Sequence, residues 1–256
     1  MRFPYWLLML PLFSQVCHAA PLRLVTFDYP PYVTEGDQGP QGLATNIVRE
    51  VFARIGKHAQ IKLYPMNRAF SLVNNRQVDG LFPLKKTPER ELTMVYPNQP
   101  LLIQDYVFFV RKDSPWQFNG KLESIAGARI GITRNVFYSP RLDQALKAGL
   151  FAAVDSTDSH ELNLRKLLAG RVDIVPCSRA VGLQLLQTMP GGNKAVQTGP
   201  SIEKVASYLV FAPGPEAAKL AALFDQAMTR MSKDGSLNRL IANDLRRQQQ
   251  APISIH

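Results

Sequence analysis

The segment RLVTF (Arg23–Phe27) leads through a proline-rich turn into ATNIVREVFARI (Ala44–Ile55), and QIKLY (Gln60–Tyr64) follows. The first and third segments are short apolar runs of the strand type. The middle segment repeats its apolar residues at helical spacing, and Gly56 follows it as a typical helix stop. Strand, helix and strand in this order predict two parallel neighbouring strands, the unit of an α/β fold.

The same alternation continues along the rest of the chain. Further helices are expected at Asn67–Asn75, Pro140–Ala148, Ser159–Leu168, Arg179–Gln187, Pro215–Met231 and Leu237–Arg247. Further strands are expected at Gly80–Leu84, Tyr106–Val110, Ala128–Ile132, Val172–Val175 and Ser207–Ala212. We therefore predict an α/β protein whose sheets contain parallel strands and are flanked by helices.

Two features indicate that the chain forms two lobes. The first is a weak echo between Leu63–Leu84 and Leu164–Val175, each of which runs from a helix through Val-Asp into an apolar strand. Two ordinary helix-to-strand turns would explain this echo equally well. The second is the pair of strands Tyr106–Val110 and Ser207–Ala212, which we interpret as crossings between a discontinuous lobe and an inserted one. The expected boundaries are 21–104 and 207–256 for the first lobe and 105–206 for the second.

Composition and charge exclude several classes of protein. The chain has 256 residues, of which 46% are hydrophobic, so it can form a packed core and is not expected to be disordered. Its formal charge of +10 gives it a cationic bias, which by itself identifies no ligand. Lysine and arginine do not cluster into a long stripe, however, and we expect no nucleic-acid partner.

The first twenty residues are typical of a secretory signal peptide. Arg2 precedes the apolar run Tyr5–Phe13, and small residues follow, with cleavage expected after Ala19 or Ala20. The run is shorter than the ~20 residues of a membrane span. A lipoprotein anchored at Cys17 is a weaker alternative, because small residues do not precede this cysteine. We therefore expect an exported, periplasmic protein with a charge of 10 − 1 = +9 after cleavage.

Sequence signals for enzymatic chemistry are sparse. The sequence has no G-x-S-x-G, H-E-x-x-H, Walker or G-x-G-x-x-G motif. His58 and His160 lie in polar segments beside helices, and we expect both at the surface. Cys177 follows an apolar strand without a histidine nearby, so we expect a packing role for it. We expect neither a metal ion nor a cofactor.

Several residues are candidates for binding a small anion. Arg90 follows an apolar strand and a turn, where a guanidinium can hold a carboxylate through two parallel hydrogen bonds. A salt bridge to Glu89 or Glu91 is an equally good interpretation of the same residue. Arg68 begins a helix directly after a strand, which is the edge where open α/β sheets bind ligands. Tyr29 lies in a stiff turn after the first strand and can present an aromatic face.

Short motifs follow one another along nearly the whole chain after residue 20. They are LVTFDYPPY (Leu24–Tyr32), Gly42-Leu43, Val78-Asp79-Gly80, Thr87-Pro88-Glu89-Arg90, Tyr96-Pro97, Val110-Arg111-Lys112, GARIGI (Gly127–Ile132), Gly170-Arg171-Val172-Asp173 and Lys233-Asp234-Gly235-Ser236. No one of these motifs is decisive by itself. In their order and spacing they resemble the polar amino-acid class of bacterial periplasmic solute-binding proteins, often called family 3.

This resemblance implies two α/β lobes, joined by two crossing strands, that close by a hinge motion on a solute. Members of the family deliver the solute to an ABC importer or present it to a receptor. The expected partner of this protein, itself a monomer, is therefore a permease or a sensor receptor. Arg90 matches the family arginine that grips the solute carboxylate, Tyr29 an aromatic cover and Met66 a stacking position. Lys85 stands where a small hydroxyl residue usually helps to bind the carboxylate.

The chain departs from the family pattern at two places. Arg134, Asn135 and Phe137 belong to a stretch that replaces the Gly-Thr usually found after the second-lobe strand, so they are candidate ligand contacts. Ser178 stands where the family has the acid that holds the α-ammonium group of the ligand. Without this acid, an α-amino acid would leave a buried ammonium unpaired, which is costly.

The surplus of positive charge around these positions leads to a hypothesis about the ligand. Arg68, Lys85 and Arg90, together with Arg134 and Arg179, favour a small anionic or carboxylate-bearing solute. A ring in the solute would fit between Tyr29 and Phe137. An ordinary amino acid is the close alternative.

Two further functions stay open at this point. Some cyclohexadienyl dehydratases resemble the same family, and such an enzyme would need a general acid in the cleft. The stretch Arg134–Tyr138 contains no carboxylate to serve as one. A sensory module that hands its ligand-bound form to a receptor is the other possibility. The sequence does not separate it from transport, because the docking partner is another chain.

Overall fold

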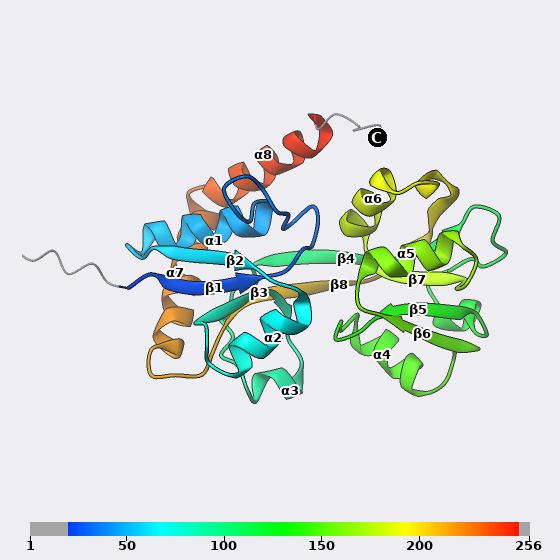
Figure 1. Cartoon of the computed structure of the whole chain (residues 1–256), viewed down its shortest axis with the longest axis horizontal. Helices are drawn as coiled ribbons and strands as arrows, with labels where there is room; N and C mark the ends of the chain where they lie inside the picture. Colours follow the sequence, from blue (N-terminus) through cyan, green and yellow to red (C-terminus); the bar gives the residue numbers. More distant parts are fainter. Residues whose placement is uncertain (1–19, 251–256) are drawn as a thin grey trace, which may run out of the picture.

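Eight strands form one mixed sheet in the computed structural model, which describes residues 20–250 without the side chains at 245 and 247–250. The order across the sheet is β2-β1-β3-β8-β4-β7-β5-β6 (Figure 1). β1 is parallel to β2 and β3, and β5 is parallel to β6 and β7. This confirms the α/β fold predicted from the alternation of strands and helices. The strands are β1 Leu22–Thr26, β2 Ala59–Leu63, β3 Gly80–Lys85, β4 Leu102–Arg111, β5 Arg129–Thr133, β6 Ala153–Thr157, β7 Ile174–Ser178 and β8 Ala195–Phe211.

Two long strands join the two halves of the molecule. β4 and β8 pair antiparallel, from Leu102 opposite Ser207 to Arg111 opposite Ala195. β8 also pairs with β3, and β4 also pairs with β7. The first half therefore contains β1, β2 and β3, and the second half contains β5, β6 and β7, with β4 and β8 running between them (Figure 1).

Helices flank the sheet in both halves. In the first half α1, α7 and α8 contact one another, whereas α2 packs against β1 and β3 (Figure 1). In the second half α5 and α6 pack against the strands. The helices are α1 Leu43–Arg54, α2 Met66–Asn74, α3 Pro88–Glu91, α4 Pro140–Lys147, α5 His160–Leu168, α6 Arg179–Thr188, α7 Ala217–Lys233 and α8 Ser236–Gln250, with 3-10 turns at Leu122–Ile125 and Gly192–Lys194.

Alternate residues of β4 belong to two different hydrophobic cores. Val107 and Phe109 lie in the core that fills the first half and continues to α5 and α6. Tyr106, Phe108 and Val110 lie in the core on the opposite side of the second half. Successive side chains of a strand point to opposite faces of the sheet. Both faces of this crossing strand are buried from Tyr106 to Val110, which explains the uninterrupted apolar run YVFFV at these positions.

The internal echo of the sequence corresponds to the same local structure in both halves. Asp79 accepts a hydrogen bond from the backbone N–H of Arg23 at 2.7 Å, and Asp173 accepts one from Arg129 at 2.8 Å. In each pair the guanidinium also contacts the carboxylate. The backbone N–H of each aspartate donates to the carbonyl of its arginine at 2.8 Å. Each Val-Asp therefore joins the turn before β3 or β7 to the start of the neighbouring parallel strand, β1 or β5.

Four strands differ by more than one residue from those expected from the sequence, and the first of them, β4, begins at Leu102 instead of Tyr106. β6 was not predicted, because its sequence AVDST forms an edge strand that is partly exposed and has no apolar run. β7 begins at Ile174 instead of Val172, since Asp173 takes part in the turn described above. β8 begins at Ala195, well before the expected Ser207, because a Gly-Pro pair interrupts its pattern.

The expected signal peptide lies outside the described residues, apart from residue 20. Among the helices within residues 20–250, none is both long and apolar enough to cross a membrane. Cys177, for which a packing role was expected, is a free and fully buried cysteine in β7.

Asp173, the aspartate of the repeated turn in the second half, should contribute measurably to the free energy of unfolding. Asp173→Ala removes two acceptors from Arg129, so we expect the free energy of unfolding to fall by about 1–3 kcal/mol. Urea denaturation measures this change. Asp113→Ala is the control, because its exposed ion pair with Arg111 is expected to contribute only about 0–1 kcal/mol. Equal losses in the two variants would contradict the prediction.

Candidate functional site

A small cavity lies where the two halves meet, beside the end of β3 and the loop that follows β5. Its volume is about 30 Å³, which is room for a water molecule or two and too little for an amino acid. The halves are therefore closed on each other. The lining residues are Phe27, Tyr29, Met66, Phe70, Pro83, Leu84, Lys85, Arg90, Gln104, Tyr106, Asn135, Val136, Phe137, His160 and Ser207.

Lys85 is the last residue of β3, and its ammonium group is buried beside this cavity. The residue is 7% exposed, Nζ lies 3.6 Å from the centre of the Tyr106 ring, and it donates a hydrogen bond to the carbonyl oxygen of Phe137. Among the described residues no carboxylate forms an ion pair with Lys85. Burial, with a smaller contribution from the charge of Arg90, lowers the pKa of Lys85 well below its ordinary value.

Arg90 reaches the same cavity from the short helix α3. Thr87 caps this helix and accepts from the backbone N–H of Arg90 at 3.3 Å, which fixes the direction of the side chain. The guanidinium stacks on Phe70 at 5.0 Å and donates to the carbonyl oxygens of Lys85 at 3.0 Å and of Asn135 at 2.8 Å.

The alternative interpretation of Arg90, a salt bridge to a neighbouring glutamate, does not hold in the structure. Glu91 forms an ion pair with Lys86 at 3.0 Å instead. Glu89 is exposed, and within the described part of the chain Arg90 has no carboxylate partner. Lys85 and Arg90, the two cations beside the cavity, therefore contact only backbone carbonyls and aromatic rings.

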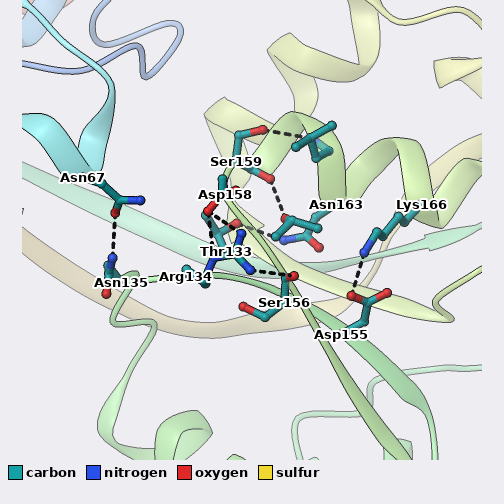
Figure 2. A network of polar contacts seen from close by, with 12 residues as sticks. Asn67, Thr133, Arg134, Asn135, Asp155, Ser156, Asp158, Ser159, Asn163 and Lys166 are labelled. Carbon is teal, nitrogen blue, oxygen red and sulfur yellow. Dashed lines mark hydrogen bonds and ion pairs between the residues drawn. The ribbon is translucent and has the colours of Figure 1, made fainter.

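The loop Arg134–Tyr138 of the second half supplies the acceptors for these two cations. Asn135 O accepts from Arg90, and Phe137 O accepts from Lys85. Asn135 also donates through Nδ2 to Asn67 of α2 at 2.7 Å, and Figure 2 shows the two amides facing each other across the gap between the halves. Its φ of 61° lies in the left-handed region, which asparagine tolerates better than most residues. The closed arrangement thus depends on neutral carbonyls, which bind cations more weakly than a carboxylate does.

A chain of hydrogen bonds holds Tyr29 in place. Its hydroxyl lies 3.0 Å from that of Tyr106 and accepts from Gln104 Nε2 at 2.8 Å, while Gln104 Oε1 accepts from Ser207 at 3.0 Å. Gln104, Tyr106 and Ser207 come from the crossing strands β4 and β8. Tyr29 therefore has a rigid, buried ring, and the strands that connect the two halves fix its position.

His160 is the main residue that the sequence analysis placed wrongly. It was expected at the surface, but it is only 7% exposed and lines the cavity. Ser159 caps α5 and fixes the ring at the first turn of this helix, where it packs on Tyr29 with 5.8 Å between ring centres. Burial, with Lys85 as a smaller cause, lowers the pKa of His160 to about 3, so the ring is neutral at physiological pH. The polar residues around it gave no sign of this burial, because Ser159 caps α5 and the charged neighbours Asp158 and Glu161 form exposed ion pairs.

The other predicted site residues fall into two groups. Tyr29, Met66, Lys85, Arg90, Asn135 and Phe137 line the cavity together. Arg68 is exposed on α2, Arg134 is exposed and paired with Asp158, and Ser178 is fully buried at the end of β7. None of these three lines the cavity, and their roles in binding stay predictions. No sequence signal pointed to Phe70, Gln104 and Ser207, because they stand in an ordinary helix and in ordinary strands.

An acidic opening adjoins the cavity at His160. Its lining includes Asp28, Asp158 and Glu161, and it shares Tyr29 and His160 with the cavity. Asp158 is paired with Arg134 and Glu161 with Arg165. Partial burial and the charge of Glu161 raise the pKa of Asp28. Within residues 20–250, no group of three or more His, Cys, Asp or Glu side chains has the arrangement of a metal site.

Comparisons with known proteins place this geometry in context. Residues 23–243 match the family described as bacterial extracellular solute-binding proteins, family 3. A search of the curated proteins found no match.

Three solved structures illustrate the shared fold. A histidine kinase sensor domain with similarity to periplasmic binding proteins has a TM-score of 0.77 at 21% identity, covering 89% of this chain and 97% of that chain. An ancestral arginine-binding protein bound to arginine has a TM-score of 0.74 at 19% identity, covering 88% and 98%. A putative L-cystine ABC transporter from Listeria monocytogenes has a TM-score of 0.71 at 16% identity, covering 87% and 94%. These likenesses show the two-lobe fold of periplasmic binding proteins.

Removing the buried charge of Lys85 should stabilise the protein in the absence of a ligand. We expect Lys85→Met to raise the free energy of unfolding at pH 7 by about 1–4 kcal/mol, because the ammonium is buried without a carboxylate. The gain should shrink as the pH rises toward 10.5, the ordinary pKa of lysine, since only the protonated side chain is penalised. Urea denaturation at several pH values measures it. The adjacent, exposed Lys86→Met is the control, and a destabilised Lys85→Met would contradict the prediction.

Acidification should destabilise the protein through His160. Between pH 6.5 and about 3 the unfolded chain binds a proton at this histidine and the folded chain does not, so stability falls as the pH falls. The slope from this one group is at most about 1.4 kcal/mol per pH unit. Melting temperatures measured from pH 7 to pH 4 should therefore drop less in His160→Gln than in the wild type. His58→Gln, at an exposed position, should behave like the wild type. An unchanged acid response in His160→Gln would refute the assignment.

Proposed function

The chain belongs to the bacterial extracellular solute-binding proteins of family 3, and we propose that it captures a small carboxylate-bearing solute. The solute is an amino acid or a related organic anion, and the two lobes close on it by a hinge motion. The protein acts in the periplasm after cleavage of its signal peptide, as a monomer, and delivers the solute to the permease of an ABC importer.

One observation carries this proposal. Lys85 and Arg90 lie beside one cavity, and among the described residues neither has a carboxylate partner. A buried ammonium without an anion costs free energy. A solute carboxylate supplies the missing negative charge and forms charge-assisted hydrogen bonds with both cations, which are stronger than the present bonds to carbonyls.

The same arrangement explains how the solute favours closure. Its carboxylate takes the place of Asn135 O and Phe137 O at the two cations, so the loop must shift as the solute enters. Solute contacts from both lobes then stabilise the closed state more than the open one. Phe27, Phe70 and Phe137 surround the site and favour a solute with an apolar or aromatic portion.

A sensory role is the second candidate, and a specific likeness favours it. The histidine kinase sensor domain has a TM-score of 0.77 with this chain. In that role the closed, solute-bound lobes would bind a receptor domain instead of a permease. Crosslinking in cells with and without the solute distinguishes the two, because the protein captured would be a permease in one case and a membrane receptor in the other.

The carboxylate site can be tested with one substitution at Arg90. A thermal-shift screen of residues 21–256 should identify a stabilising solute among amino acids, di- and tricarboxylates and aromatic acids. A solute present at 100 times its dissociation constant adds about 2.7 kcal/mol of stability. We expect Arg90→Ala to weaken the binding of this solute by about 10- to 100-fold in isothermal titration calorimetry, because a charge-assisted hydrogen-bond pair is lost.

Arg171→Ala provides the matched control for that titration. Arg171 is exposed in the second lobe and does not line the cavity, so its removal changes the net charge by the same amount without touching the site. It should leave the affinity unchanged. Equal loss in both variants would mean that only the general charge of the protein attracts the solute, and binding that survives in Arg90→Ala would refute the proposed site.

A further inference from the structure

His160 has a polar atom that the closed protein leaves without a partner. Its Nε2 is buried and makes no hydrogen bond, although the ring is more than nine-tenths buried. The ring lines the same cavity as Lys85 and Arg90. An orphaned buried donor or acceptor costs roughly 1–3 kcal/mol, so a side chain of this kind beside a cavity indicates a missing partner.

The neighbours of the imidazole determine which of its nitrogens carries the proton. Nδ1 lies 3.2 Å from Thr133 Oγ1. Figure 2 shows that Thr133 in turn contacts Asn163, whose Nδ2 donates to Thr133 Oγ1 at 2.9 Å. With Asn163 as the donor to this hydroxyl, Nδ1 is the acceptor that pairs the hydroxyl's own proton among the described contacts, and on this ground we assign the donation from Thr133 to Nδ1. With this assignment the proton of the neutral ring is on Nε2, and Nε2–H is a buried donor without a partner in a ring that lines the cavity.

The position of this donor is fixed from both lobes. On the second lobe, Thr133 and the capped first turn of α5 hold the ring from behind. On the first lobe, Tyr29 packs against its face, and the crossing strands in turn hold Tyr29. A donor whose position is fixed in this way favours ligands that carry a hydrogen-bond acceptor at the matching position.

We infer that His160 is a ligand-binding residue, and that its Nε2–H donates to a second acceptor in a carboxylic acid held by Lys85 and Arg90. This inference rests on the proposed function and narrows its ligand class. The ligand is therefore a carboxylic acid with an oxo or hydroxy group as this second acceptor. An ammonium group in its position would face the Nε2–H donor of His160, and two donors of positive polarity repel each other. Ser178 offers no carboxylate as an alternative partner for an ammonium.

The acidic opening beside His160 is the feature that argues for an amino acid instead. Asp28 approaches it from the first lobe and Glu161 from the second. Glu161 is paired with Arg165 at 2.7 Å, and burial together with the charge of Glu161 raises the pKa of Asp28, so an ammonium at this opening would meet a negative potential. An ammonium there would pair with Asp28 and Glu161 instead of meeting Nε2–H of His160. Asp28→Asn tests this arrangement directly.

Matched acids separate the two possibilities. We would titrate the wild type with 2-oxoglutarate, L-glutamate and glutarate, and with phenylpyruvate, L-phenylalanine and 3-phenylpropionate. Within each set only the group next to the carboxylate differs: an oxygen acceptor, an ammonium or hydrogen. In at least one set, the oxo acid should bind at least 10-fold more tightly than the other two.

The variants then assign that preference to His160. His160→Leu should reduce the affinity for the oxo acid about 10- to 100-fold, to the level of the unsubstituted acid, whose own affinity should hardly change. His160→Gln keeps an N–H donor and should retain part of the preference. Melting temperatures of both variants establish that they are folded, and the glutamine variant keeps the test valid if the leucine variant is not.

The other outcomes overturn the inference in distinguishable ways. An oxo-acid preference that persists in both His160 variants, while Arg90→Ala abolishes binding, would remove His160 from the ligand site and leave the carboxylate site intact. Tighter binding of the amino acid that is lost in Asp28→Asn would replace the inference by an ammonium site at the acidic opening. The absence of binding by all six acids, or binding that is insensitive to Arg90→Ala, would overturn the proposed carboxylate site and the inference together.

Discussion

The burial of the Lys85 ammonium between the two lobes is the constraint on which the site depends. Lys85 is the last residue of β3, and its side chain lies in an apolar and aromatic environment. It contacts the ring of Tyr106 and the carbonyl of Phe137 there. Neither of these is an anion, so the charge is compensated only in part. A buried charge of this kind is stabilised best by an oppositely charged group with good hydrogen-bond geometry. The closed protein thus holds an arrangement that a small carboxylate would complete.

The rest of the fold makes this arrangement possible by keeping each half rigid and allowing the two halves to meet. In each half an Arg–Asp pair fastens the central strand to its parallel neighbour. The two halves are connected through β4 and β8, whose side chains are buried on both faces near the crossing. Gln104, Tyr106 and Ser207 on these strands hold Tyr29 at the base of the cavity. The contacts across the cleft involve side-chain amides and backbone carbonyls, which a solute can replace at low cost.

Much of the site was predictable from the sequence, because the motifs that carry it are local. Arg90 stands just after an apolar strand and a turn, Tyr29 lies in the turn after the first strand, and Lys85 stands at a position that the family resemblance singled out. Asn135 and Phe137 stood out because they replace a pattern expected at that loop. His160 and Gln104 could not be found in the same way. Their sequence surroundings are those of an ordinary helix start and an ordinary strand, and only the packing of the other lobe buries them.

The sequence by itself determined the α/β fold, the repeated Val-Asp turns and the surplus of positive charge near the strand ends, since these depend on periodicity and on neighbours close along the chain. The tertiary structure decided which cations share one cavity, that Arg90 has no glutamate partner, and that His160 is neutral and buried. These properties arise from contacts between residues as far apart as Tyr29 and His160 or Lys85 and Phe137. Burial and charge pairing are set by the sum of such contacts, and no local pattern in the sequence contains them.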